Sequence, residues 1–558
     1  MKKLTLILAT LILSGIVFAQ NTLPFSKGVN MPMFFENWNK GRILPDLNRY
    51  TEADFVCLKS MGVDIIRLPI NCDVLTDEEF GAGTIHEPVL KKLDEVCDWA
   101  ERNQIYLIID NHNNQTFDKP SYTSNDFILL QKQLESAWTQ IAQRYADRSD
   151  YIIYEIMNEP AGKNADKWYK IQQGIINLIR RYDASRKIIV SGVNWSNITE
   201  LTQLKPYKDE NLIYTFHFYE PWGFLTDGSG PLSDIGEIPF PYDEKRFPKL
   251  PDNLSWIKDQ CRKEGNIKHI NSRIKKAADW AKKNNVTLLC GEFGTKIWTN
   301  PKDRAAWNKA VTSAFRENNI PYCVWGVIEC NGLVQTKIRS IEYLGYLDFP
   351  DDIDAYIAES YGFSMPASEA VAKIKAGYDD FPKKPYVVYD GIGGTRSRMG
   401  IWNVNEKKVS DSHEYCLVMS YPQKYGNSGV NLPKLIASKF EENVDSLVVC
   451  LDVKFTDKSQ SFEVLLQDSD FGRKELPWSK HYELKAADYA LNEWVTVEIP
   501  VSSFQENRGV YSDVDQKWYD LPCEFTWSRF QKVFLDFNDH NDSKKGDVFV
   551  DNIIIKKE

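Results

Sequence analysis

The sequence lacks the short motifs that mark many metal-dependent, serine-dependent and nucleotide-binding proteins. His-Glu-x-x-His, Gly-x-Ser-x-Gly and the phosphate-binding P-loop pattern are all absent. No two of the ten cysteines have Cys-x-x-Cys spacing, and most lie in strand-like or helix-like runs, so we interpret them mainly as buried thiols. These absences argue against a zinc centre, a hydrolase triad of the Gly-x-Ser-x-Gly type and a P-loop nucleotide site.

A basic excess is also missing, and only one long apolar run occurs. The net charge is −10, with both signs interspersed, which argues against nucleic acid as a partner. The apolar run, residues 4–17, follows Lys2 and Lys3 and precedes Val17-Phe18-Ala19, so residues 1–19 resemble a cleavable signal peptide. We therefore expect a secreted protein, extracellular or periplasmic, with no membrane partner after cleavage.

At 558 residues the chain is long enough for two or three domains. Residues 20–380 alternate short apolar runs with longer amphipathic stretches, which predicts a (β/α)₈ barrel, the TIM-barrel form of α/β fold. The predicted strands are residues 28–33, 63–70, 105–112, 151–158, 187–192, 212–219, 287–292 and 321–327. The long segment 220–265, rich in glycine, proline and aromatics, is typical of an insertion that shapes a binding cleft.

Beyond residue 386 the period of the apolar residues changes from 3.6 to 2. Residues 449–455, 462–466, 494–501, 532–537 and 547–555 alternate as strands do, and no helix of any length is predicted there. Residues 387–558 are therefore interpreted as an all-β sandwich of jelly-roll type. We read residues 381–386 as a linker, and expect the barrel to fold and act without the sandwich.

Two glutamates, Glu159 and Glu292, end apolar strands. A carboxylate at the end of a core strand is poorly solvated, so a pair of them suggests shared chemistry on one substrate bond, as in retaining glycoside hydrolysis. Each alone could be a satisfied loop carboxylate. Other predicted strands also end on polar or aromatic groups, namely Arg67, His112, Asn158, His217, Tyr219 and Trp325.

This set resembles glycoside hydrolase family 5 over residues 25–380. The resemblance lies in Arg on the second strand, His on the third, Asn-Glu on the fourth, His-x-Tyr on the sixth, Glu on the seventh and Trp on the eighth. It implies that Glu159 is the acid/base, with a raised pKa, and that Glu292 is the nucleophile. It also implies that Arg67 and Tyr219 stabilise Glu292, that Asn158 binds the sugar 2-OH, that His112 and His217 orient the carboxylates, and that Trp325 lies beneath the reacting sugar. One departure is Asn113, where many members have a second histidine.

The resemblance implies a secreted retaining endo-β-1,4-glucanase that acts on a β-linked polysaccharide without a catalytic cofactor or a metal in the barrel. We expect a monomer. A β-mannanase or xyloglucanase on the same barrel, and an inactive surface glycan-binding protein, remain alternatives. Trp38, Trp195 and Trp222 follow strand ends and are candidates for stacking further sugars, with core packing as the alternative.

The C-terminal domain resembles the jelly-roll carbohydrate-binding modules of cellulases, through Trp494-Val-Thr-Val-Glu-Ile-Pro and Gly546-Asp-Val-Phe-Val-Asp-Asn. That resemblance implies a structural Ca²⁺, with Asp390 and Asp551 as candidate ligands, although an ordinary surface role is open for either. The candidate sugar-stacking residues are Trp402, Trp478, Trp518 and Trp527, for each of which a core role is the alternative.

Overall fold

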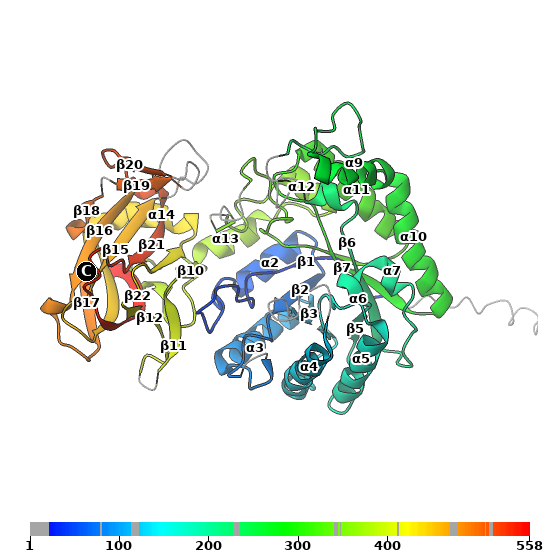
Figure 1. Ribbon diagram of the computed structural model, residues 1–558, viewed down its shortest axis with the longest axis horizontal. Coiled ribbons are helices and arrows are strands. Elements are labelled where there is room, and N and C mark those ends of the chain that lie inside the picture. The colour runs from blue at the N-terminus through cyan, green and yellow to red at the C-terminus, as the bar shows by residue number, and fades with distance from the viewer. Residues whose placement is uncertain are drawn as a thin grey trace, which may run out of the picture.

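The protein has two bodies, a helix-ringed barrel and a β-rich domain beside it (Figure 1). The computed structural model describes residues 22–78, 81–112, 122–226, 232, 235–339, 344–345, 347–409, 412–468, 478–507, 509–512 and 517–558. The predicted signal peptide and Asn113 lie outside the described residues. None of the described helices is both long enough and apolar enough to cross a membrane.

The first body is a closed barrel of eight parallel strands in sequential order, β1 to β8, with β8 pairing back to β1. The predicted (β/α)₈ barrel is thus confirmed. Its strands are β1 (Lys27–Asn30), β2 (Ile65–Ile70), β3 (Tyr106–Asn111), β4 (Ile152–Glu155), β5 (Ile188–Ser191), β6 (Leu212–Phe218), β7 (Thr287–Phe293) and β8 (Tyr322–Val324).

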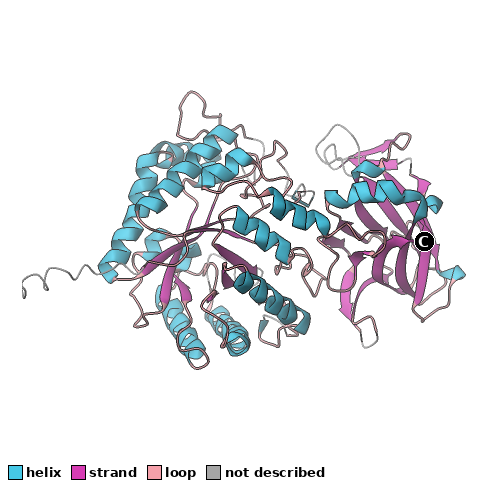
Figure 2. Cartoon of the chain, turned by 180° about the vertical axis from the view of Figure 1, so that it is seen from behind, coloured by secondary structure: helices cyan, strands magenta, loops and turns pink. Residues whose placement is uncertain are grey.

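The helices of the barrel lie outside the strands, as Figure 2 shows in a second view. The longer ones are α2 (Glu52–Ser60), α3 (Glu87–Arg102), α4 (Ser124–Tyr145), α5 (Ala165–Arg180), α9 (Ser255–Glu264), α10 (Ile267–Asn284), α11 (Pro301–Glu317) and α13 (Ser368–Ala376). The shorter ones are α6 (Val193–Ser196), α7 (Ile198–Leu201), α8 (Trp222–Leu225), η3 (Asp252–Leu254) and α12 (Ala355–Tyr361). Helices α8 and α9, with η3, lie in the predicted insertion 220–265.

The side chains inside the barrel change from apolar to polar along the strands. A separate apolar cluster contains Phe25, Ile65, Ile108, Ile153, Ile189, Ile213, Leu289 and Cys323. Because alternate residues of a strand point to the same side, the positions two residues further on also face inward. These positions hold Arg67, Asp110, Glu155, Ser191, Thr215, Gly291 and Trp325, of which the first five are at most 1% exposed. The barrel interior therefore has an apolar base and a buried polar layer directly above it.

The second body is a sandwich of two six-stranded sheets, which confirms the predicted β-sandwich. One sheet has the order β10-β13-β21-β15-β16-β18, and the other has β11-β12-β22-β14-β17 with β9 paired to β22. The strands are β9 (Tyr386–Tyr389), β10 (Arg398–Trp402), β11 (Asn405–Lys408), β12 (Tyr415–Tyr421), β13 (Asn427–Asn431), β14 (Leu447–Phe455), β15 (Ser461–Asp468), β16 (Ser479–Lys485), β17 (Val495–Pro500), β18 (Gln505–Glu506), β21 (Phe530–Asp536) and β22 (Gly546–Lys557). A separate hairpin joins β19 (Gly509–Ser512) to β20 (Lys517–Asp520).

The expectation that this domain has no helix is wrong. Helix α14 (Lys434–Asn443) runs for ten residues and buries Ile436, Ala437 and Phe440 in the sandwich core. Short 3₁₀ turns occur at η5 (Val444–Ser446), η6 (Ala486–Asp488), η7 (Val501–Ser503) and η8 (Trp527–Arg529). A helix of ten residues carries few apolar positions, so its 3.6 period is easily missed between long strand-like segments.

The two bodies share a polar interface built mainly on the segment between β1 and α2. Arg396 of the sandwich donates two hydrogen bonds to Asp54 (2.5 and 2.7 Å), the capping-box residue of α2, and neither side chain is more than 9% exposed. Asp46 accepts from the backbone N–H of Met399 at 3.2 Å, and Arg396 N–H donates to the carbonyl of Asn48 at 2.9 Å. The predicted linker is short, and Phe381 packs into the sandwich core.

These contacts argue against our expectation that the barrel folds and acts without the sandwich, and a truncated chain tests it. A chain ending at residue 382 would expose Asp54, Asp46 and the apolar residues packed around them. Because removing one partner of a buried ion pair typically costs about 3–5 kcal/mol, we expect the truncated chain to melt roughly 5–10 °C below the full chain, or to aggregate. Calorimetry of both chains in one buffer checks this. An unchanged melting temperature would show that the interface contributes little.

Candidate active site

Arg67 on β2 organises the polar layer of the barrel. Its guanidinium group is fully buried and binds Glu155 through two hydrogen bonds of 2.7 and 2.8 Å. It also donates to Asn158 and Glu292, both at 2.8 Å, and to Asn30 at 3.0 Å. A planar guanidinium with five donors can hold several acceptors in fixed directions. Arg67 thus joins strand ends β1, β4 and β7 and fixes the carboxylate of Glu292.

Glu292 ends β7 and is 5% exposed. Its Oε1 accepts from Arg67, and its Oε2 accepts from the Tyr219 hydroxyl at 3.1 Å. Burial raises the pKa of Glu292 above its ordinary value, and the nearby Glu159 acts in the same direction, whereas His217 and Arg67 oppose the rise. These two donors therefore fix the orientation of the Glu292 carboxylate.

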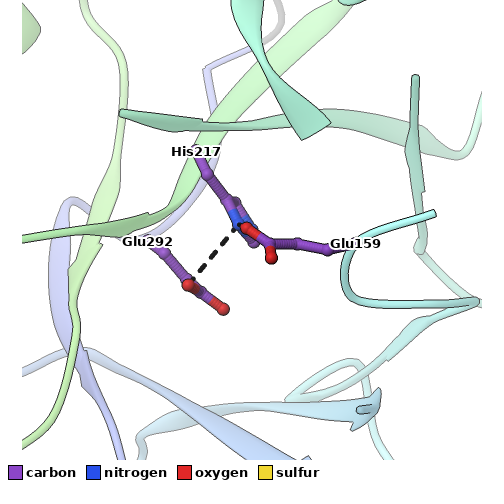
Figure 3. Close-up of side chains that lie close together, drawn as sticks. All are labelled: Glu159, His217 and Glu292. Atoms are coloured by element: carbon purple, nitrogen blue, oxygen red, sulfur yellow. Dashed lines mark hydrogen bonds and ion pairs between the residues drawn. The ribbon is translucent and has the colours of Figure 1, made fainter. Parts of the chain in front are cut away.

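Glu159 lies opposite Glu292, with the His217 ring between them (Figure 3). His217 Nδ1 is 2.6 Å from Glu159 Oε1 and 3.5 Å from Glu292 Oε2. One ligand atom from each of the three residues lies within 4.8 Å of the others. Burial lowers the pKa of His217 to about 4, so the ring is neutral at neutral pH and contacts Glu159 through a hydrogen bond rather than an ion pair.

His112 and Trp325 form the opposite wall. His112 Nδ1 is 2.6 Å from Asp110, its Nε2 is 3.1 Å from Asn158 Nδ2, and its ring stacks on Trp325 with centroids 5.3 Å apart. Asp110 is fully buried and fixes the histidine ring from below. Asn158 therefore lies between Arg67 and His112, with both ends of its amide oriented.

The structure brings together all eight residues predicted to form the centre of the site. Three further residues complete the site and were not predicted. Asp110 stands two residues before His112, Glu155 stands four residues before Glu159, and Asn30 is the last residue of β1. Asp110 and Glu155 could have been found from the sequence, because each is a charged residue at an inward-facing position of an apolar strand. Glu36, Asn37 and Asn71, all buried beyond β1 and β2, were missed as well, because they lie in loops with no periodicity.

The three candidate stacking tryptophans differ in their surroundings. Trp38, beyond β1, is 43% exposed. Trp222, beyond β6, is 37% exposed and stacks on Trp256 of the insertion, with centroids 5.5 Å apart. Trp195 is half-buried, and its backbone N–H donates to the carbonyl of Pro160, which follows Glu159. Trp38 and Trp222 are thus both exposed, the latter with Trp256 stacked on it, whereas Trp195 packs beside the Glu159 loop.

Glu159, His217 and Glu292 also have the donor types and closeness of a metal site. One of these groups, Glu292, already has the protein partners that suit an ionised carboxylate, since Arg67 and Tyr219 both donate to it. A positive guanidinium beside the carboxylate disfavours a second cation there. A metal-free barrel remains our prediction.

The pKa of Glu292 predicts the acid side of the activity profile. Glu292 can attack only when ionised, and because its pKa is raised, activity should fall at a pH above the ordinary 4.5. Replacing Tyr219 by phenylalanine removes a donor to the ionised form, which should move this limb to higher pH. Measuring kcat/KM as a function of pH for the wild type and for Tyr219→Phe checks this shift. The fall of activity at alkaline pH should be the same in both and serves as the internal control. An acid limb that stays in place or moves to lower pH would contradict this role of Tyr219.

An arginine-anchored carboxylate facing a second carboxylate, at the carboxyl end of a parallel barrel, is the site of a glycoside hydrolase. The family model described as "Cellulase (glycosyl hydrolase family 5)" matches residues 26–330, more than half of the chain. The chain belongs to this family.

Relatives with curated descriptions agree with this placement. Endoglucanase 3 of Fibrobacter succinogenes is 29% identical over 329 residues, which cover 54% of this chain and 49% of the relative. Endoglucanase C of Acetivibrio thermocellus is 24% identical over 290 residues, covering 49% of this chain and 83% of the relative. The chain thus matches only about half the length of the Fibrobacter protein.

Solved structures with similar folds include two glucan-related proteins. A hyperthermophilic endo-beta-1,4-glucanase in complex with substrate aligns with a TM-score of 0.45 and 26% identity, over 57% of this chain and 96% of that chain. Cellulose synthase subunit Z of Clostridioides difficile aligns with a TM-score of 0.48 and 22% identity, over 61% and 99% of the two chains.

Proposed function

We propose that the protein is a secreted, retaining endo-β-1,4-glucanase that hydrolyses β-glucan chains by double displacement. The observation that supports this most strongly is the pair of carboxylates, Glu159 and Glu292, with oxygens within 4.8 Å of each other. Retaining enzymes hold their carboxyl groups about 5–5.5 Å apart, whereas inverting enzymes leave roughly 6.5–9.5 Å for a water. One oxygen of each carboxylate within 4.8 Å of the other supports the shorter, retaining spacing.

In the proposed mechanism Glu159 protonates the leaving oxygen while Glu292 attacks the anomeric carbon. Arg67 and the Tyr219 hydroxyl hold Glu292 at the attack position and stabilise its charge before the bond forms. Glu159, now ionised and contacted by His217, then removes a proton from the water that releases the sugar. Asn158, fixed by Arg67 and His112, is placed to bind the sugar 2-OH, a contact that strengthens in the transition state.

A reducing-sugar assay tests the polymer specificity. Carboxymethylcellulose and mixed-linkage glucan should be the best substrates among a panel that also contains xyloglucan, mannan and xylan. A preference for mannan or xyloglucan would replace the glucanase assignment with one of the alternatives on the same barrel. Inactivity on every polymer, together with binding, would favour the inactive glycan-binding protein.

We further propose that the sandwich binds glycan and that the chain is an extracellular or periplasmic monomer. Trp518 and Trp402 support glycan binding, since they are 72% and 54% exposed. Trp478 is only 3% exposed and Trp527 packs against the core, so neither offers an open face. Retention of the protein on insoluble glucan, lost on replacing Trp518 and Trp402 by alanine, tests this role.

A structural Ca²⁺ in the sandwich also remains a proposal. Asp551 is 3% exposed, its Oδ1 has no hydrogen-bond partner, and Asp390 is close enough to raise its pKa further. These two residues suit part of a calcium shell, which needs six to eight oxygens. Among the described residues they do not form a group of three side-chain ligands, so backbone or water oxygens would have to complete it.

A further inference from the structure

The segment immediately beyond β1, at the carboxyl end of the barrel strand, carries Glu36 and Trp38. Trp38 is 43% exposed. Glu36 is buried, its Oε2 accepts from the Met33 N–H at 2.6 Å, and its Oε1 has no partner. Burial raises the pKa of Glu36 to about 8, and the carboxylates of Glu329, Asp110 and Glu292 lie near enough to raise it further. Glu36 therefore lies close to the carboxylates of the site, and the exposed Trp38 follows two residues later in the chain.

Asn37 is fixed from two directions. Its backbone N–H donates to Asn71 Oδ1 at 2.7 Å, and its side-chain Nδ2 donates to the carbonyl of Arg42 at 2.8 Å. Asn71 in turn donates to the carbonyl of His112 at 2.7 Å, and the His112 ring contacts Asn158. Hydrogen bonds through Asn37 and Asn71 thus connect the Arg42 segment to the backbone of His112, whose ring contacts Asn158.

The Arg42 segment is held by one carboxylate of the sandwich. Glu406 on β11 is 4% exposed, and its Oε2 accepts from the backbone N–H groups of Ile43 (2.7 Å) and Leu44 (2.9 Å). Its Oε1 accepts from the Tyr389 hydroxyl at 3.0 Å and lies 3.8 Å from Arg42 Nη2. Its own N–H donates to the carbonyl of Gly41 at 2.6 Å. A buried carboxylate with this many donors is rigid and is costly to displace.

We propose that Glu406 is a positioning residue of the active site, through which the β-sandwich holds Asn37 and so places Trp38 and Glu36 against the bound glycan. The sandwich would then form part of the binding site of the barrel, in addition to any glycan contact of its own. This inference rests on the proposed action on β-glucan, with Trp38 as a sugar-stacking residue.

A double-mutant cycle in the full-length chain tests the inference. We expect Trp38→Ala to raise KM for cellohexaose roughly 3- to 10-fold, the loss of one aromatic stacking contact, with kcat little changed. Glu406→Ala should raise KM to a similar extent. Because both changes remove the same contact, the double variant should resemble Trp38→Ala alone rather than show the product of the two effects. Glu406→Gln keeps an acceptor for Ile43 and Leu44 and should retain most of the affinity.

Glu498→Ala is the matched control. It removes a carboxylate from β17 of the same sheet, where Glu498 pairs with Lys556 on the surface, and it should leave KM unchanged.

If Glu406→Ala does not fold, Asn37→Asp, which places an acceptor against the Arg42 carbonyl, replaces it in the cycle. An unchanged KM, a loss of kcat alone, or multiplicative effects would each overturn the inference. If the wild-type chain hydrolyses no β-glucan, the proposed function fails instead, and the cycle is measured as dissociation constants on the glycan it binds.

Discussion

Replacing Glu292 by glutamine should lower kcat/KM by at least about 10⁴-fold on every substrate, whatever its leaving group. Glutamine has nearly the same shape but cannot form the glycosyl ester that the first displacement requires. Arg67 can still donate to the amide oxygen, and the Tyr219 hydroxyl, which donates to the other oxygen in the wild type, can accept from the amide NH2 instead, so the site should remain assembled. Substrate binding is therefore expected to survive the loss of turnover.

Kinetics on an aryl cellobioside and on cellohexaose, with isothermal titration of cellohexaose, separate the two effects. Glu498→Gln, the same chemical change on the outer strand β17, serves as the control and should keep full activity. Retention of more than a few per cent of wild-type activity in Glu292→Gln would remove this residue from the role of nucleophile.

Replacing Glu159 by glutamine should produce a loss that depends on the leaving group. Cellohexaose needs protonation of a sugar oxygen, so kcat/KM should fall about 10²- to 10⁴-fold, the usual contribution of a general acid. A 2,4-dinitrophenyl cellobioside leaves without protonation, so its kcat/KM should remain within about tenfold of wild type. Its kcat should still fall, because Glu159 also activates the water of the second step.

Azide distinguishes this assignment from a general disturbance of the site. A small anion that needs no base can replace water in the second step, so azide should restore kcat of Glu159→Gln on the activated substrate. It should do nothing for Glu292→Gln. Equal losses on both substrates, or no response to azide, would contradict the assignment of Glu159.

Much of the barrel and the centre of the site could be predicted from the sequence because both depend on strand periodicity. Once the strands are placed, alternation puts Arg67 inside the barrel, and the strand ends bring Glu159 and Glu292 to one face. The same alternation would have revealed Asp110 and Glu155, since each occupies an inward-facing position close to the end of its strand. These two were overlooked because a buried acid within an apolar run has no motif of its own.

The interface between the two bodies could not be predicted in this way. Glu406 meets Ile43, and Arg396 meets Asp54, across more than 340 residues of sequence. A charged residue that pairs with a partner so distant in the sequence looks like an ordinary surface charge. Residues 381–386 were therefore interpreted simply as a linker, although the domains that they join are held together by buried hydrogen bonds.

The most direct test of the account is to trap the intermediate with a 2-deoxy-2-fluoro-cellobioside that has a good leaving group. The fluorine slows both steps, and the leaving group compensates only the first, so the glycosyl enzyme accumulates. Mass spectrometry of the digested protein should find the added fluorinated disaccharide on the peptide that contains Glu292. A label on Glu159, or steady hydrolysis with no labelled peptide and an inverted anomer as the first product, would contradict the proposed mechanism.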